Sequence, residues 1–282
     1  MKLAAGYIVF DGLETLEHSI KSIRNCVDLV IVSYQTISWG NTQCSPNLIS
    51  ELNRLQQIGL VNHIIEFKDF RPSSLIHPNE VLMAKSYETL KRQSTLELAL
   101  SLGATHYLSM DADEFYLESE FNKAKTFIMN NDIDASAVHY INYVTPTLSQ
   151  GYSKFKVPFI YKINKNSRHH SQQGIFSNID PTRGLFDESY SKIKVFDKSE
   201  ISMHHMEMYR SDLMLKYQSS SRYFRDRSLL PTLINDINLS KSSKELEYTA
   251  IHFGDTISQL HSKFSLIECE NLFNLPTNCN CL

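Results

Sequence analysis

The stretch Thr105-His-Tyr-Leu-Ser-Met-Asp-Ala-Asp-Glu-Phe-Tyr116 decides how the rest of the chain is interpreted. Residues 106–110 favour β structure and come after a segment with a helical pattern. This order predicts a buried strand of a parallel sheet. Three carboxylates, Asp111, Asp113 and Glu114, come directly after it. In open α/β sheets the ligand site lies beyond the carboxyl ends of the strands, so we expect the acids to lie at a ligand site.

Three acids in four residues need a compensating charge. Burial and mutual repulsion destabilise them unless a cation or a basic partner lies close by. A hard divalent cation with oxygen ligands would satisfy this need. The alternative is a solvated acidic turn or a helix N-cap, because Asp and Glu are favoured in both. The spacing alone leaves the two interpretations open.

Composition narrows the class of protein. The 282 residues are 42% hydrophobic and 21% charged with a net charge of -3, which is typical of a folded protein and gives no reason to expect a nucleic-acid partner. We expect no transmembrane segment or signal peptide, although peripheral membrane association stays open. Five cysteines without zinc-like spacing predict reduced thiols and a cytoplasmic protein, in the host cytoplasm if the source is a virus.

The first part of the chain alternates between apolar runs and helical patterns. This predicts a strand–helix repeat and a right-handed, mostly parallel sheet. The loop Phe10-Asp-Gly-Leu-Glu14 is not a G-x-G-x-x-G, and no P-loop occurs, so the dinucleotide and Walker fingerprints are missing. The expected strands are residues 3–10, 27–33 and 61–67, and the expected helices are residues 13–23, 47–58 and 83–102.

The later part of the chain changes character after a helix at residues 119–130. Residues 137–145 and 155–163 are β-rich and predict an antiparallel hairpin, followed by a polar loop region and a short apolar run at 201–206. A basic helix is expected at 211–228, and the remainder to residue 282 is expected to be helical. We therefore expect a catalytic domain at 1–210, with halves 1–118 and 119–210, and a helical extension at 211–282.

The block Lys91-Arg92-Gln-Ser-Thr-Leu-Glu-Leu-Ala99, followed by Gly103-Ala-Thr-His-Tyr-Leu-Ser-Met-Asp-Ala-Asp-Glu114, resembles a known family. It is similar to the arginine, glycine, strand and D-x-D block of GT-A fold nucleotide-sugar glycosyltransferases, family 2-like, of bacterial or viral type. The chain departs from that pattern at Gln93, where Asn is usual, and at Asp11-Gly12, where many members have Asn-Glu. The resemblance implies an α/β, GT-A type fold: a Rossmann-like, mostly parallel central sheet flanked by helices, with a small antiparallel hairpin region and a helical C-terminal extension.

The resemblance also implies roles for particular residues. Asp111 would face the ribose or metal-bound water, and Asp113 would bind Mn²⁺ or Mg²⁺ between the two phosphates of a UDP- or GDP-type sugar donor. A late histidine would complete the metal shell. His204 and His205 are the candidates, and because neighbours in a strand face opposite sides only one can point into the crevice; we favour His205. The expected sugar-nucleotide contacts are Phe10, Asp11, Arg92, Asp111 and Arg183, and the expected diphosphate clamp is Arg183, Lys216 and Arg222.

Catalysis by inversion would need a carboxylate base near the acceptor. Asp180 is the choice because Pro and Gly surround it, with Asp187, Glu188 and Glu207 as alternatives. The predicted function is metal-dependent transfer of a sugar from a nucleoside diphosphate to a hydroxyl of a glycan or another acceptor. A metal-dependent hydrolase, a nucleotidyltransferase and a non-catalytic sugar-nucleotide module are the alternatives. The oligomeric state is left open.

Overall fold

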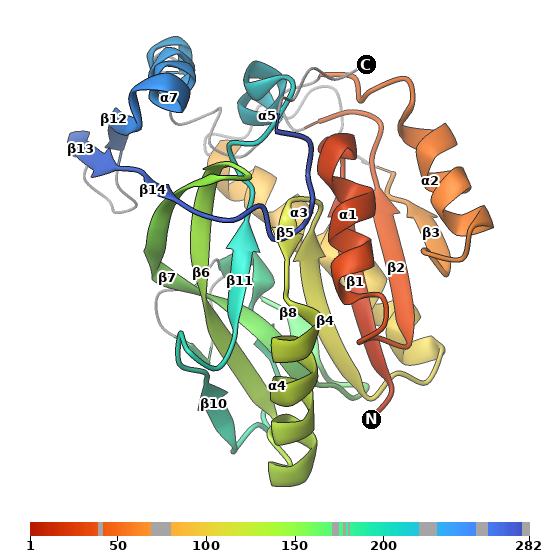
Figure 1. Cartoon of the computed structure of the whole chain (residues 1–282). Coiled ribbons are helices and arrows are strands. Elements are labelled where there is room, and N and C mark those ends of the chain that lie inside the picture. Colours follow the sequence, from red (N-terminus) through yellow and green to blue (C-terminus); the bar gives the residue numbers. More distant parts are fainter. Residues whose placement is uncertain are drawn as a thin grey trace.

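The computed structural model describes residues 1–38, 42–68, 80–170, 175–176, 179, 181–219, 230–251 and 259–277. One large mixed sheet runs through the molecule, with strands in the order β3-β2-β1-β4-β7-β6-β11-β5. Helices cover both of its faces (Figure 1). Helices α1, α2 and α4 contribute to the main apolar core on one face, and α3 packs against the other.

The first half is the predicted strand–helix repeat. Its four strands are parallel, and β1 lies between β2 and β4. The alternation of apolar runs and amphipathic patterns therefore predicted this half correctly. The elements are β1 (Leu3–Val9), α1 (Leu13–Ile23), β2 (Leu29–Tyr34), α2 (Leu48–Gln57), β3 (His63–Glu66), α3 (Glu80–Ser101) and β4 (His106–Asp111).

The second half contains the predicted antiparallel hairpin. Strands β6 and β7 pair antiparallel, β7 continues the sheet beside β4, and β11 lies between β6 and β5. This arrangement places β11, which carries His204 and His205, directly against Glu114 of the acidic turn. The elements are β5 (Glu114–Phe115), α4 (Glu118–Asn131), β6 (Ala135–Thr145), β7 (Leu148–Lys162), β8 (Arg168–His169), a 3-10 turn (Pro181–Arg183), β9 (Leu185–Phe186), β10 (Ile193–Val195) and β11 (Ser202–His205).

The C-terminal region corrects one prediction. It contains α5 (Leu213–Gln218) and α7 (Leu230–Ser243), but the expectation that the rest is helical was wrong. Strands β12 (Glu245–Ile251) and β13 (Gln259–Ser265) form a separate antiparallel pair, and β14 (Ile267–Glu268) adds to the edge of β7. The physical reason is the alternation of apolar and polar residues in Glu245-Leu-Glu-Tyr-Thr-Ala-Ile251, which has the period of a strand. The domain boundary at 210 stays a prediction.

Among the described residues, no helix is long and apolar enough to cross a bilayer.

Candidate functional site

The acids lie where the order of the parallel strands reverses. Strands β3, β2 and β1 extend to one side of this point and β4 lies on the other, which is the usual position of a ligand crevice in such sheets. Ile8 of β1 pairs with Asp111, the last residue of β4, so Phe10 and Asp11 leave β1 beside the acidic turn. The predicted position of the acids at a strand end is confirmed.

Asp113 is the most enclosed of these groups. Its side chain is 1% exposed, and Oδ2 accepts from Arg210 Nη2 at 2.5 Å and from Lys216 Nζ at 2.7 Å. Burial alone would raise the pKa of Asp113, but Lys216 and Arg210 hold it well below the usual range. Asp113 is therefore a carboxylate with one oxygen saturated by the protein's own cations.

Asp111 and Glu114 share a second pair of basic residues. Arg92 Nη2 lies 3.0 Å from Asp111 Oδ1, Arg183 Nη2 bonds to Asp111 Oδ2, and Arg183 Nη1 lies 2.5 Å from Glu114 Oε1. Burial would raise the pKa of Asp111, but Arg183 and Arg92 lower it. Burial raises the pKa of Glu114 to about 8, although Arg183 opposes this shift. Asp111 keeps 28% of its side chain exposed and is the acid most open to a ligand.

The two histidines face different surroundings. His205 Nε2 lies 3.7 Å from Asp113 Oδ1, and its Nδ1 lies 3.0 Å from Asn142 Oδ1. The ring of His204 points away, with Nδ1 bonded to Tyr143 Oη at 2.8 Å and Phe273 packed against the ring. The alternation along β11 separates them as expected, and it removes His204 from the set of candidate metal ligands.

Other predicted contacts lie behind the acids or outside the described residues. Arg92 lies within α3 and is fully buried, bonded to Glu88, Ser109 and Asp111. It therefore orients Asp111 and has no surface for a ligand. Phe10 is buried, and Asp11 lies 3.9 Å from Arg210 Nε. The predicted base Asp180 and the predicted clamp residue Arg222 lie outside the described residues.

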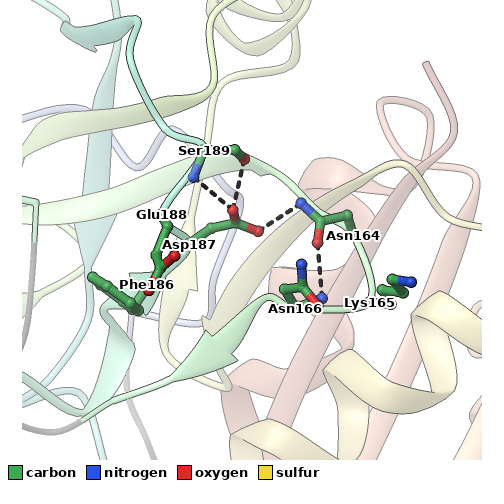
Figure 2. A pocket seen from close by; sticks show the side chains of 7 residues that line it. All are labelled: Asn164, Lys165, Asn166, Phe186, Asp187, Glu188 and Ser189. Carbon is green, nitrogen blue, oxygen red and sulfur yellow. Dashed lines mark hydrogen bonds between the residues drawn. The ribbon is translucent and has the colours of Figure 1, made fainter.

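A hollow of about 540 Å³ lies at the opposite end of the sheet (Figure 2). It follows the end of β7, whose Lys162 pairs with His106 at the start of β4. Asp187 in its wall accepts hydrogen bonds from Asn164, Ser167 and Ser189, so this carboxylate ties two loops together. Asp187 and Glu188, considered as alternative bases, line this hollow and lie away from the acids.

Sequence reasoning missed two buried basic residues. Arg210 is 5% exposed and bridges the turn after β1 to Asp113. Lys91 Nζ donates to the carbonyl of Val9 at 2.8 Å, and burial lowers its pKa to about 7. No motif marked Arg210. The signal for Lys91 was its place beside Arg92 on the helix face that meets the strand ends.

The donor set fits a divalent cation only in part. In the described ranges, no group of three or more His, Cys, Asp or Glu side chains could hold a metal ion. Asp113 Oδ1 and His205 Nε2 nevertheless face each other, and 3.7 Å is shorter than roughly 4.2 Å, the sum of two metal–ligand bonds. One cation can therefore contact both. Mn²⁺ and Mg²⁺ commonly use one or two protein ligands and complete their shell with water and substrate phosphate.

Comparison with known proteins gives structural similarity alone. No protein-family model and no curated protein matches the chain. The S. aureus TarS structure aligns with a TM-score of 0.43 and 12% identity over 73% of this chain and 37% of that chain. TarS 1-349 in complex with UDP-GlcNAc aligns with a TM-score of 0.41 and 11% identity, over 85% of this chain and 73% of that chain. CMP:2-keto-3-deoxy-manno-octonic acid synthetase with CTP aligns with a TM-score of 0.32 and 10% identity, over 58% of this chain and 72% of that chain. This chain thus spans 37% of the length of the TarS chain, and the similarity assigns no activity.

Proposed function

We propose that this chain is a metal-dependent glycosyltransferase that moves a sugar from a nucleoside diphosphate to a hydroxyl of a glycan or a similar acceptor. One observation carries the proposal. A facing carboxylate and imidazole, Asp113 and His205, lie at the strand crossover and are bordered by Arg210, Lys216 and Arg183. That combination suits a cation and a diphosphate bound side by side.

The charges of the site favour the two ligands together. Four acids, Asp11, Asp111, Asp113 and Glu114, lie among four basic residues, Arg92, Arg183, Arg210 and Lys216. A divalent cation and the diphosphate of a sugar nucleotide add charges that cancel. The pair together therefore leaves the net charge of the site unchanged, whereas either ligand alone would add an unbalanced buried charge.

Catalysis would consist mainly of stabilising the leaving diphosphate. The cation held by Asp113 and His205 would supply Lewis-acid neutralisation of that leaving group. Lys216 and Arg183 would donate charge-assisted hydrogen bonds to its oxygens, and Asp111, oriented by Arg92, would accept from the ribose hydroxyls. Asp180 stays the proposed base for an inverting reaction and would take the proton from the acceptor hydroxyl.

Two alternatives are separated from the proposal on different grounds. A nucleotidyltransferase would be expected to use a Gly-rich, Lys-bearing loop after the first strand, and residues 10–14 do not provide one. A hydrolase would need water to reach the metal and no second substrate. It is separated from the proposal by its products rather than by its site.

The experiment is thermal unfolding with Mn²⁺ and a panel of UDP- and GDP-linked sugars and free diphosphates. At about 100 times its dissociation constant, a ligand adds about 2.7 kcal/mol to stability. We expect one nucleotide to stabilise the protein only with Mn²⁺, and Asp113→Asn to abolish the effect. Asp132→Asn, which removes an exposed carboxylate paired with Lys162, is the matched control and should respond like the wild type.

The products of the stabilising donor then decide the reaction. Transfer of its sugar to an added acceptor supports the proposal. Release of free sugar by hydrolysis of the donor, at the same rate with and without acceptors, would favour the hydrolase, and no stabilisation by any nucleotide would reject the proposal.

A further inference from the structure

Asn142 lies directly opposite His205 in the sheet. Strands β6 and β11 run parallel, and the pairing register aligns these two residues. Asn142 Oδ1 lies 3.0 Å from His205 Nδ1. The ring of Tyr140, also on β6, packs against the imidazole edge to face at 5.9 Å and 81°. The sequence therefore places a polar and an aromatic neighbour from one strand around a single histidine.

This contact determines which ring nitrogen of His205 carries the proton. An amide oxygen only accepts hydrogen bonds, so with Oδ1 of Asn142 turned toward the ring, Nδ1 of His205 is the donor. In the neutral imidazole the other nitrogen, Nε2, then carries a lone pair. That lone pair points toward Asp113 Oδ1 at 3.7 Å, a second acceptor. Two acceptors that face each other are unfavourable unless a proton or a metal cation lies between them.

We infer that Asn142 is a positioning residue, which holds His205 in the tautomer whose Nε2 faces Asp113 as a ligand for a divalent cation. A hydrogen bond from the second ring nitrogen of a metal-binding histidine sets both its tautomer and its orientation. Only the metal half of this inference rests on the proposed function. The tautomer is a property of the chain alone.

The first test is nitrogen NMR of the histidine rings at pH 8 without metal or nucleotide. The His205 signals are assigned by their loss in His205→Gln. We expect Nδ1–H in the wild type and in Asn142→Asp, which keeps an acceptor. We expect a shift to Nε2–H in Asn142→Leu, because Asp113 then becomes the nearest acceptor. Nε2–H in the wild type would overturn the inference.

The second test is Mn²⁺ affinity, measured by the broadening that the metal causes in the same ring signals. Loss of such a supporting hydrogen bond typically weakens metal binding 10–100-fold, and we expect this for Asn142→Leu. Asn142→Asp should retain the affinity. Tyr143→Phe is the matched control, because it removes the equivalent ring hydrogen bond from His204 one residue away. It should leave Mn²⁺ affinity unchanged.

The outcomes separate this inference from the proposed function. Equal effects of Asn142→Leu and Tyr143→Phe, or no Mn²⁺ broadening in the wild type, would overturn it. If the predicted tautomer and Mn²⁺ binding are found but no nucleotide stabilises the protein, the glycosyltransferase proposal fails and this inference stands.

Discussion

At the scale of single residues, the acidic turn is neutralised by the protein itself. Each of the three acids has a basic partner, and three of those partners, Arg183, Arg210 and Lys216, come from beyond residue 180. The expectation that either a cation or a basic partner compensates the acids is therefore met by basic partners. The protein's own cations therefore offset the acids, and Lys216 and Arg183 among them are the groups that the proposed diphosphate would bind.

Lys216 is the partner best placed to change from Asp113 to a phosphate, because its side chain is 19% exposed whereas that of Arg210 is 2% exposed. We expect Lys216→Met to weaken binding of the stabilising nucleoside diphosphate by roughly 10-fold to 100-fold, since hydrogen bonds to charged groups contribute about 1.5–3 kcal/mol. Titration calorimetry measures the affinity. Lys162→Met, at an exposed ion pair with Asp132, is the control and should bind normally. Equal affinities in both variants would remove Lys216 from the site.

His169 predicts acid sensitivity of the fold. It is 7% exposed beside Tyr107, and burial, helped by Arg92, lowers its pKa to about 3 from 6.5. The unfolded chain therefore takes up a proton first, so the contribution of His169 is complete above pH 6.5 and is lost as the pH falls toward 3.

We expect the free energy of unfolding to fall by about 2 kcal/mol more between pH 8 and pH 5 in the wild type than in His169→Leu, because the slope approaches 1.36 kcal/mol per pH unit below pH 6.5. Urea titrations at several pH values measure the free energy of unfolding. The difference between the two proteins at pH 8 gives the effect of the altered packing alone, which is then subtracted at lower pH. Parallel pH profiles for the two proteins would contradict the prediction.

At the scale of elements, α3 connects the fold to the site. It carries Lys91 and Arg92 to the ends of β1 and β4, where they bind Val9 and Asp111. It can approach the sheet this closely because β1 has a glycine at position 6. A Cβ there would collide with the hydroxyls of Tyr107 and Thr95.

Gly6→Ala should therefore destabilise the protein by about 1–3 kcal/mol, which is the usual cost of overpacking a core. The free energy of unfolding in urea measures this. The double variant Gly6→Ala/Tyr107→Phe should be more stable than the sum of the single changes predicts, because it removes one colliding hydroxyl. Simple additivity would show that the strain lies elsewhere.

The sequence predicted the elements well where one local pattern was decisive. The apolar runs and helical periods of residues 3–111 identified the strands and helices of the parallel half, and the alternation of sides along β11 predicted that His204 and His205 face different surroundings. It failed for β12 and β13, where short alternating segments have weak signals. Arg210 was missed for a different reason: its role depends on a contact with a residue 97 positions away.

At the scale of the whole molecule, the C-terminal segment belongs to the same body as the acidic turn. Strand β14 extends the main sheet, and Leu275 packs with Phe115, Tyr143, Met206 and Tyr209 in a separate apolar cluster. Tyr209 Oη also donates to the carbonyl of Pro276 at 2.7 Å. Phe115, which directly follows the three acids, is therefore packed against the segment around Leu275.

This packing predicts that a destabilising substitution in the C-terminal segment lowers the free energy of unfolding of the whole molecule. Leu275 is 2% exposed and Leu272 is 39% exposed, three residues apart in the same segment. We expect Leu275→Ala to lower the free energy of unfolding by about 2–4 kcal/mol, as for other buried leucines, and Leu272→Ala to change it by less than about 0.5 kcal/mol. Calorimetry would show one shifted transition for Leu275→Ala if the segment unfolds with the sheet. A separate low-temperature transition, with the main one unchanged, would instead show that the extension is an independent unit and that the acidic turn is stable without it.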